Sequence, residues 1–188
     1  MKREIILASA SPRRNELLKI ITDEFKVIPS TIEENVPDTI PVLKVPEFLA
    51  ELKAKDVAQS FPDSIVIGSD TAVIVDDKIL GKPKSRKDAY DMISLLSGKT
   101  HFVVTGCSIV CGKTAESFSC ITEVEFNNLS ENDINDYIDT PEPYDKAGAY
   151  GIQGKGALLV KKINGDYFNV VGLPISMLNS CLKKMSGI

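Results

Sequence analysis

The sequence predicts an α/β fold in which a mixed sheet is flanked by helices and divided into two lobes. Strand and helix patterns alternate along the first half of the chain, and a long hairpin-like pair of strands follows within residues 101–126. This succession of elements is typical of a mixed sheet. The chain has 188 residues, of which 43% are apolar. That size and composition suit one globular domain, or one domain of two closely packed lobes, and exclude wholesale disorder.

The N-terminal third of the chain predicts alternating strands and helices. An apolar run ahead of a turn signal indicates a buried strand over residues 3–8, and apolar residues at helical spacing indicate a helix over 12–21. A short strand over 25–29 and a proline-containing loop over 30–46 come next. The following helix, over 46–60, begins with a proline, which the first turn of a helix tolerates.

The middle of the chain predicts further strands and a third helix. Two apolar runs, over residues 64–68 and 72–76, indicate two strands with the sequence GSDT around the break between them. Residues 77–78 predict a tight connection to the apolar pair at 79–80. A helix over 85–97 follows, with the serine at its first position as the N-cap.

The second half of the chain opens with the long pair of strands. Residues 101–126 are rich in Thr, Val, Phe and Ile, and the two strands that they predict join around Gly112 and Lys113. Residues 130–138 predict a short helix, because a capping serine is followed by acidic residues. Residues 139–156, rich in Gly, Pro, Tyr and Asp, predict an ordered loop.

The C-terminal residues predict one more hairpin and a final helix. Strands are expected over 157–163 and 166–171, on either side of the turn signal Asn164-Gly165. A helix over 173–185 closes the chain.

Charge and hydropathy argue against two classes of protein. Lys and Arg number 22 and Asp and Glu 26, so the net charge is −4, and there is no basic stripe with interleaved aromatic residues, as a nucleic-acid binder would need. The apolar run near the N-terminus breaks at Ser9, which is too short for a secretory signal. No segment approaches the roughly 18 apolar residues of a membrane span. We expect a cytoplasmic protein that binds neither nucleic acid nor membrane.

The cysteines and the single histidine do not form a metal-binding pattern. Cys107 and Cys111 are four residues apart on a predicted strand, and His101 lies six residues before the first of them. A zinc site is one reading, but buried free thiols are favoured for these two and for Cys120 and Cys181.

Two arginines begin the first predicted helix. Ser11 suits the N-cap position and Pro12 the first helical position, so Arg13 and Arg14 fall in the first turn. Cations there repel the positive end of the helix dipole, whereas a bound phosphate would accept from both the free N–H groups and the guanidinium groups. The pair therefore indicates either an anion site or two solvated basic residues.

Carboxylates near the ends of two predicted strands could form a metal site. Asp70, in GSDT, follows a buried apolar run, where a metal ligand or a general base is common in α/β proteins. The alternative is a turn aspartate that bonds its own backbone. Glu33 and Glu34 lie in the loop after the second strand, and with Asp70 they could bind Mg²⁺, which takes one or two carboxylates plus phosphate oxygens.

Two lysines and a glycine-rich segment complete the candidate residues. Lys53 lies on the second helix and Lys82 in a loop before a proline, and together with Arg13 they could neutralise a triphosphate. Residues 145–154 (DKAGAYGIQG) would allow close approach of backbone to a ligand, and the amide of Gln153 suits the edge of a base. A tight structural loop is the alternative, and neither a P-loop nor a GxGxxG motif is present.

Taken together, these segments resemble the Maf-like nucleoside triphosphate pyrophosphatases, also called septum-formation inhibitor proteins. The resemblance covers almost the whole chain in order, and the eight segments together are specific although each alone is weak. They are LASASPRR (7–14), EE (33–34), LAELKAK (49–55), IGSDT (67–71), LGKP (80–83), LSGKTHFVVTG (96–106), EPYDKAGAYGIQG (142–154) and GDYFNVVGLP (165–174).

The resemblance implies a fold and an activity. The family cleaves nucleoside triphosphates between the α and β phosphates, releases a monophosphate and pyrophosphate, and needs a divalent metal, Mg²⁺ or Mn²⁺. It implies a single domain over residues 1–188, with two lobes of the inosine-triphosphatase (Maf/Ham1) type around a central cleft, and commonly a homodimer. The AYGIQG form of the late motif is similar to that of the branch that prefers dTTP and UTP. For that branch, the triphosphate of pseudouridine and 5-methyl-UTP are expected as modified substrates.

Roles for individual residues follow from the same resemblance. Asp70 and Glu34 would bind the metal, and Asp70 is alternatively the base for the attacking water. Lys53, Lys82 and Arg13 would be catalytic cations. Substrate-binding residues would be Ser9, Arg13, Arg14, Thr71, Lys82 and Gln153. Ser69 stands where family members often carry alanine, which leaves these roles unchanged.

Two other functions stay open at this point. One is a regulatory interaction protein of cell division, the role that the family's older name suggests. The other is a Maf-like pyrophosphatase that acts on 7-methyl-GTP. A pure interaction protein has no need for Asp70, Glu34 and the two lysines together, so hydrolysis of dTTP and UTP is favoured.

Overall fold

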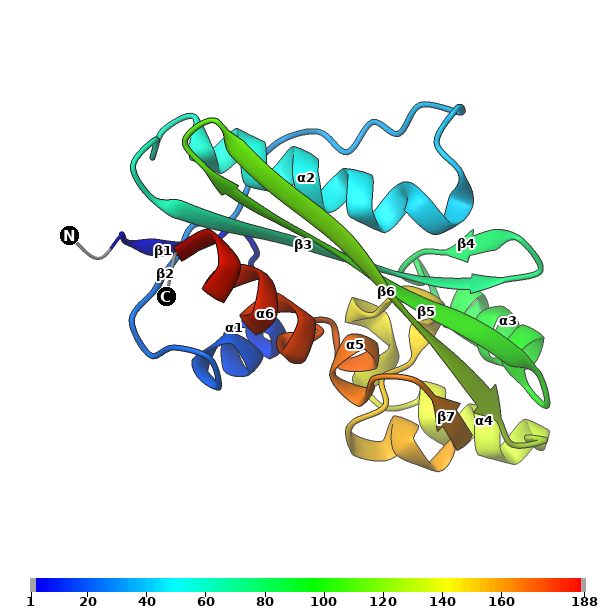
Figure 1. Cartoon of the computed structure of the whole chain (residues 1–188). Coiled ribbons are helices and arrows are strands. Elements are labelled where there is room, and N and C mark those ends of the chain that lie inside the picture. Colours follow the sequence, from blue (N-terminus) through cyan, green and yellow to red (C-terminus); the bar gives the residue numbers. More distant parts are fainter. Residues whose placement is uncertain (1–2, 187–188) are drawn as a thin grey trace. The chain divides into compact units, whose positions relative to one another are not determined.

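The computed structural model describes residues 3–186 (Figure 1). These residues form two compact units. Unit 1 contains residues 3–70, 105–120 and 172–186, and unit 2 contains residues 71–104 and 121–171. Seven strands form one sheet in the order β2-β1-β3-β5-β6-β7, with β4 paired to β3. β1 is parallel to β2 and β3, whereas β4 is antiparallel to β3 and β7 to β6. The predicted mixed sheet with flanking helices is thus confirmed, while the single domain over 1–188 stays a prediction.

Unit 1 contains the predicted N-terminal strands and helices and the C-terminal helix. Its elements are β1 (Ile5–Leu7), α1 (Pro12–Lys19), β2 (Lys26–Val27), η1 (Val42–Lys44), α2 (Val45–Ala58) and α6 (Ile175–Ser186), with parts of β3 (Ile65–Val75), β5 (Thr100–Cys111) and β6 (Thr114–Phe126). Apolar side chains of β1, α2 and β3 pack together in its core, among them Ile6, Ala54 and Val66, which are fully buried. Figure 1 shows α2 lying alongside β3.

The prediction of two separate strands over 64–68 and 72–76 is wrong, because β3 is continuous from Ile65 to Val75. The glycine in GSDT does not mark a turn. A Cβ added at Gly68 would lie 2.1 Å from the backbone oxygen of Ala50 and 2.9 Å from the Cβ of Ala54, so glycine is needed where α2 approaches the strand. The chain turns later, at Asp76 and Asp77, whose φ angles are 50° and 58°.

Unit 2 contains the rest of the three long strands, the elements between β3 and β5, and the elements from the end of β6 to Val171. These are β4 (Lys78–Leu80), α3 (Arg86–Leu96), α4 (Glu131–Ile138), η2 (Glu142–Asp145), η3 (Ala147–Ala149), η4 (Gly154–Leu158), β7 (Val160–Asn164) and α5 (Tyr167–Val171). The predicted caps are confirmed: Ser85 accepts a hydrogen bond from the Asp88 N–H, and Ser130 forms a capping box with Asp133. The loop predicted over 139–156 consists largely of short 3₁₀ turns.

The strand predicted over 166–171 is also wrong, because Tyr167–Val171 is the short helix α5. The Asp166 carboxylate accepts hydrogen bonds from the N–H groups of Phe168 (2.7 Å) and Asn169 (3.3 Å), which starts a helix. The fully buried Asn169 side chain then donates to Val103 O and Thr122 Oγ1, each at 2.9 Å. The apolar residues of this segment predict a strand, but the hydrogen bonds of Asp166 and Asn169 stabilise a helix instead.

The cysteines are free thiols, as predicted. Cys107, Cys111 and Cys181 are buried, whereas Cys120 is half-buried rather than buried as expected. Burial raises the pKa of the Cys107 thiol to about 12, so this group is an unreactive thiol at neutral pH. Across residues 3–186, no helix is both long enough and apolar enough to traverse a bilayer.

Candidate active site

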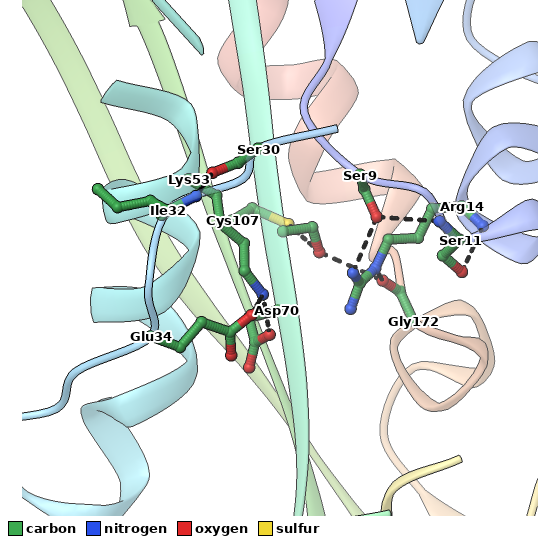
Figure 2. A network of polar contacts seen from close by, with 11 residues as sticks. Ser9, Ser11, Arg14, Ser30, Ile32, Glu34, Lys53, Asp70, Cys107 and Gly172 are labelled. Carbon is green, nitrogen blue, oxygen red and sulfur yellow. Dashed lines mark hydrogen bonds and ion pairs between the residues drawn. The ribbon is translucent and has the colours of Figure 1, made fainter. Parts of the chain in front are cut away.

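Helix α1 begins in a polar network that holds the segment 9–14 (Figure 2). Ser11 is the N-cap, and its hydroxyl accepts from the Arg14 N–H at 3.5 Å. The buried Ser9 hydroxyl accepts from the Ser11 N–H at 3.3 Å and from Arg14 Nη1 at 3.1 Å. The predicted helix start is therefore confirmed, and Ser9 and Arg14 form a pair.

A second N–H group of the Arg14 guanidinium binds a backbone carbonyl from near the C-terminal end of the sequence. Arg14 Nε donates to Gly172 O at 2.9 Å, and the buried Ser69 hydroxyl donates to the same oxygen at 3.3 Å. Burial lowers the pKa of the Arg14 guanidinium, while the negative charges of Asp70 and Glu34 act in the opposite direction. Arg14 is thus a fixed, partly desolvated cation in the field of those two carboxylates.

Lys53 joins the two carboxylates that the sequence singled out (Figure 2). Its Nζ lies 2.6 Å from Asp70 Oδ1 and 2.8 Å from Glu34 Oε1. The side chains of Lys53 and Asp70 are only 15% and 17% exposed, whereas Glu34 is 50% exposed. The inner pair is therefore shielded from water and the outer carboxylate is accessible.

The packing of α2 on β3 explains why Lys53 and Asp70 meet. Successive side chains of a strand point to opposite faces, so Gly68 and Asp70 share the face that α2 covers. Ala50 and Ala54 pack against Gly68, and Lys53 lies on the same helix beside them. The continuous strand, rather than a turn, thus presents Asp70 to Lys53.

One residue that the sequence did not indicate holds the loop of Glu34. Asp56, one turn beyond Lys53 on α2, accepts from the Ser30 hydroxyl at 2.7 Å and from the Thr31 N–H at 3.3 Å. The spacing of Lys53 and Asp56 on one helix face was the available signal, but their partners in the loop are visible only in the structure.

The carboxylates of unit 1 suit a divalent cation that is also bound by phosphate oxygens of a substrate. Among the described residues, no three His, Cys, Asp or Glu side chains are grouped as metal ligands. Asp70 and Glu34 nevertheless supply two carboxylates around one cation, Lys53, and Mg²⁺ is commonly bound by one or two carboxylates plus substrate phosphate oxygens. The donor set fits such an ion.

Unit 2 contains three of the predicted site residues. Lys82 and Gln153 are exposed, and Thr71 is half-buried next to Asp70 on β3. The segments of Lys82 and Gln153 are linked, because the Gly148 N–H donates to Gly81 O at 3.0 Å. The loop at 147–149 also packs on β3, since a Cβ at Gly148 would lie 2.9 Å from the side chain of Val73.

Comparison with solved structures shows the type of fold. A HAM1 protein from Coxiella burnetii aligns with 97% of this chain and 100% of its own, with a TM-score of 0.55 and 16% identity. The predicted fold of the Maf/Ham1 type is thus confirmed.

Comparison with known sequences shows the family. Proteins named dTTP/UTP pyrophosphatase match over nearly the whole chain. The one from Bacillus pumilus is 50% identical over 92% of each chain. The one from Alkaliphilus oremlandii is 50% identical over 96% of this chain and 95% of its own. The one from Thermosipho africanus is 51% identical over 92% of this chain and 88% of its own. The model of the family described as "Maf-like protein" matches residues 4–185. This chain therefore belongs to the Maf-like protein family.

Proposed function

We propose that this protein hydrolyses nucleoside triphosphates between the α and β phosphates, releasing a nucleoside monophosphate and pyrophosphate. dTTP and UTP, with modified pyrimidine triphosphates, are the proposed substrates. The observation that carries the proposal is Lys53 bound to both Glu34 and Asp70, in a chain about half identical to relatives named for that activity. The activity implies a cytoplasmic enzyme, and the family resemblance a homodimer.

The residues of unit 1 support the roles expected of them. Asp70 and Glu34 would hold a divalent ion, which when bound supplies charge neutralisation and a more acidic water. Asp70, held in mid-strand by Lys53, could alternatively accept the proton of the attacking water. Lys53 and Arg13 would stabilise the charge that develops on the leaving pyrophosphate, while Ser9 and Arg14 would bind phosphate oxygens.

The residues of unit 2 are proposed to contribute binding rather than proton transfer. The ammonium of Lys82 would neutralise phosphate charge, and the Thr71 hydroxyl would donate to substrate. The Gln153 amide offers both a donor and an acceptor, which matches the paired polar edge of a pyrimidine base. The exposure of Lys82 and Gln153 supports these roles, because both side chains are accessible to a ligand.

Pyrophosphate release from a panel of nucleoside triphosphates tests the proposal. We expect turnover with Mg²⁺ or Mn²⁺, none with a chelator, and the highest kcat/KM for dTTP and UTP. Preference for 7-methyl-GTP would overturn the proposed specificity but keep the reaction. Absence of turnover with every triphosphate would overturn the activity and leave the regulatory interaction protein as the function to test.

A pair of variants tests the assigned site. Asp70→Asn keeps the size of the side chain but removes the negative charge that Lys53 contacts, and we expect kcat/KM to fall by at least about a hundredfold. Asp63→Asn makes the same substitution at an exposed residue of unit 1 and should retain full activity. Full activity of Asp70→Asn would refute the proposed mechanism.

A further inference from the structure

The loop that carries Gln153 is closed by a carboxylate with no role so far. Glu142 lies at the first end of the loop, in η2. Its Oε1 accepts from the Lys155 N–H at 3.0 Å and its Oε2 from the Gly156 N–H at 3.2 Å. Each carboxylate oxygen thus satisfies one backbone donor, 13 and 14 residues further along the chain. Glu142 joins the start of the loop to the residues that immediately follow Gln153.

Backbone geometry at Gly154 fits this arrangement. Gly154 has a φ of 65°, and a Cβ there would lie 2.6 Å from Glu142 Oε1. The carboxylate therefore rests against the backbone of the residue next to Gln153, in a conformation that favours glycine. A carboxylate so close to the chain leaves the Gln153 backbone little freedom.

Other anchors hold a different part of the same loop. The Gly148 N–H donates to Gly81 O at 3.0 Å, the Gly151 N–H donates to the Tyr137 hydroxyl at 3.4 Å, and the Tyr150 hydroxyl contacts His101 Nε2 at 2.7 Å. These contacts fix residues 148–151. Glu142 acts beyond them, on Lys155 and Gly156, and the Gln153 side chain between the two regions is exposed.

We propose that Glu142 is a positioning residue that sets the backbone of Gln153 for recognition of the pyrimidine base. This inference rests on the proposed function, because the base is what Gln153 would contact. Glu142 itself would touch no substrate. Its effect would therefore reach binding and selectivity only through Gln153, while the phosphate chemistry at Asp70 would proceed unchanged.

Glu142→Gln tests the proposal with almost no change in side-chain size. A carboxylate accepts from both N–H groups, whereas an amide accepts from one and turns its own NH₂ toward the other. We expect KM for dTTP and UTP to rise about tenfold with kcat unchanged, as for an interaction made equally in the ground and transition states. Glu131→Gln, which removes one exposed carboxylate from α4 of the same unit, is the matched control and should behave as wild type.

A double-mutant cycle separates positioning from general loss of structure. If Glu142 acts through Gln153, Glu142→Gln should raise KM no further in a Gln153→Ala background. Effects of the two substitutions that multiply, or a fall in kcat at unchanged KM, would overturn the proposal.

Amide hydrogen exchange provides a readout that needs no activity. We expect the Lys155 and Gly156 amides to exchange at least about tenfold faster in Glu142→Gln, with Gly148 and Gly151 still protected. Unchanged exchange at both positions would overturn the proposal. A wild-type protein that hydrolyses no nucleotide would instead refute the proposed function, so the two failures are distinguishable.

Discussion

Stability of this protein should depend on pH through one buried histidine. His101 is 1% exposed and packs edge-on against the rings of Phe126 and Tyr150. Its Nε2 contacts the Tyr150 hydroxyl at 2.7 Å, while its Nδ1 has no hydrogen-bond partner among the described residues. Protonation would place a charge in this apolar surrounding, and burial accordingly lowers the pKa of His101 from 6.5 to about 4.

The size and sign of the effect follow from the two pKa values. As the pH falls below about 6.5, the unfolded chain binds a proton at this imidazole, whereas the folded protein does not until about pH 4. The free energy of unfolding therefore decreases over this window. Above pH 6.5, neutral His101 makes its full contribution to the free energy of unfolding. Each pH unit below 6.5 removes about 1.4 kcal/mol of this contribution, so about 3 kcal/mol is lost by pH 4.

Protonation of His101 can be followed directly by NMR, because the chain has one histidine and no tryptophan signals overlap with its imidazole. The single imidazole signal in a proton NMR titration reports on His101 alone, and its midpoint should lie near pH 4. Urea unfolding followed by circular dichroism should give a stability difference between pH 7 and pH 4 that is about 3 kcal/mol smaller in His101→Gln than in wild type. Comparing the two proteins cancels the carboxylates, which titrate in the same window.

Tyr150→Phe is the control for the cause of the shift. It removes the hydroxyl but keeps the imidazole buried, so the titration midpoint should stay far below 6.5. A midpoint near 6.5 in the wild-type protein, or parallel stability curves for wild type and His101→Gln, would refute the reasoning.

Three further substitutions test the packing and charges around the site. Lys53→Met leaves the carboxylates of Asp70 and Glu34 without their shared cation, so the rate of hydrolysis should fall about a hundredfold. Added Mg²⁺ should raise the melting temperature of this variant more than that of wild type, and an equal rise in both proteins would contradict the reasoning. Gly68→Ala places a methyl group 2.1 Å from the Ala50 oxygen, so the free energy of unfolding should fall by about 2–3 kcal/mol, whereas full stability in a urea titration would show that α2 can move away without cost. Asn169→Ala removes two buried hydrogen bonds, to Val103 O and Thr122 Oγ1, so the free energy of unfolding should fall by about 2–3 kcal/mol in the same measurement. A loss under about 0.5 kcal/mol would exclude a structural role for the Asn169 amide.

Local sequence patterns were sufficient for most elements of the fold. Ser85 and Ser130 were correctly placed as N-caps because capping needs only the residue and the next few N–H groups along the chain. The hairpin around Gly112 was also correct, since its strand composition and turn signal are contiguous. In each case the interactions that determine the structure lie within a few residues.

The errors arose where distant partners outweigh local patterns. At Gly68 a glycine suggested a break, but its cause is the backbone of α2 pressing on a continuous strand. At 166–171 the apolar run suggested a strand, but Asn169 is bound by Val103 and Thr122, which lie 66 and 47 residues away in the chain. No local pattern carries that information.

The sequence by itself determined the residue types of the candidate site and their order along the chain. The motifs shared with the Maf-like family indicated Asp70 and Glu34 as candidate metal ligands and Lys53 as a candidate cation for phosphate. The tertiary structure alone decided that one ammonium joins both carboxylates, that Arg14 is bound by Ser9 and Gly172, and that Glu142 closes the loop of Gln153. The physical reason is that such charged contacts form between side chains far apart in sequence. Their geometry depends on how a helix packs on a strand and how a loop closes, and neither is encoded in the spacing of the residues themselves.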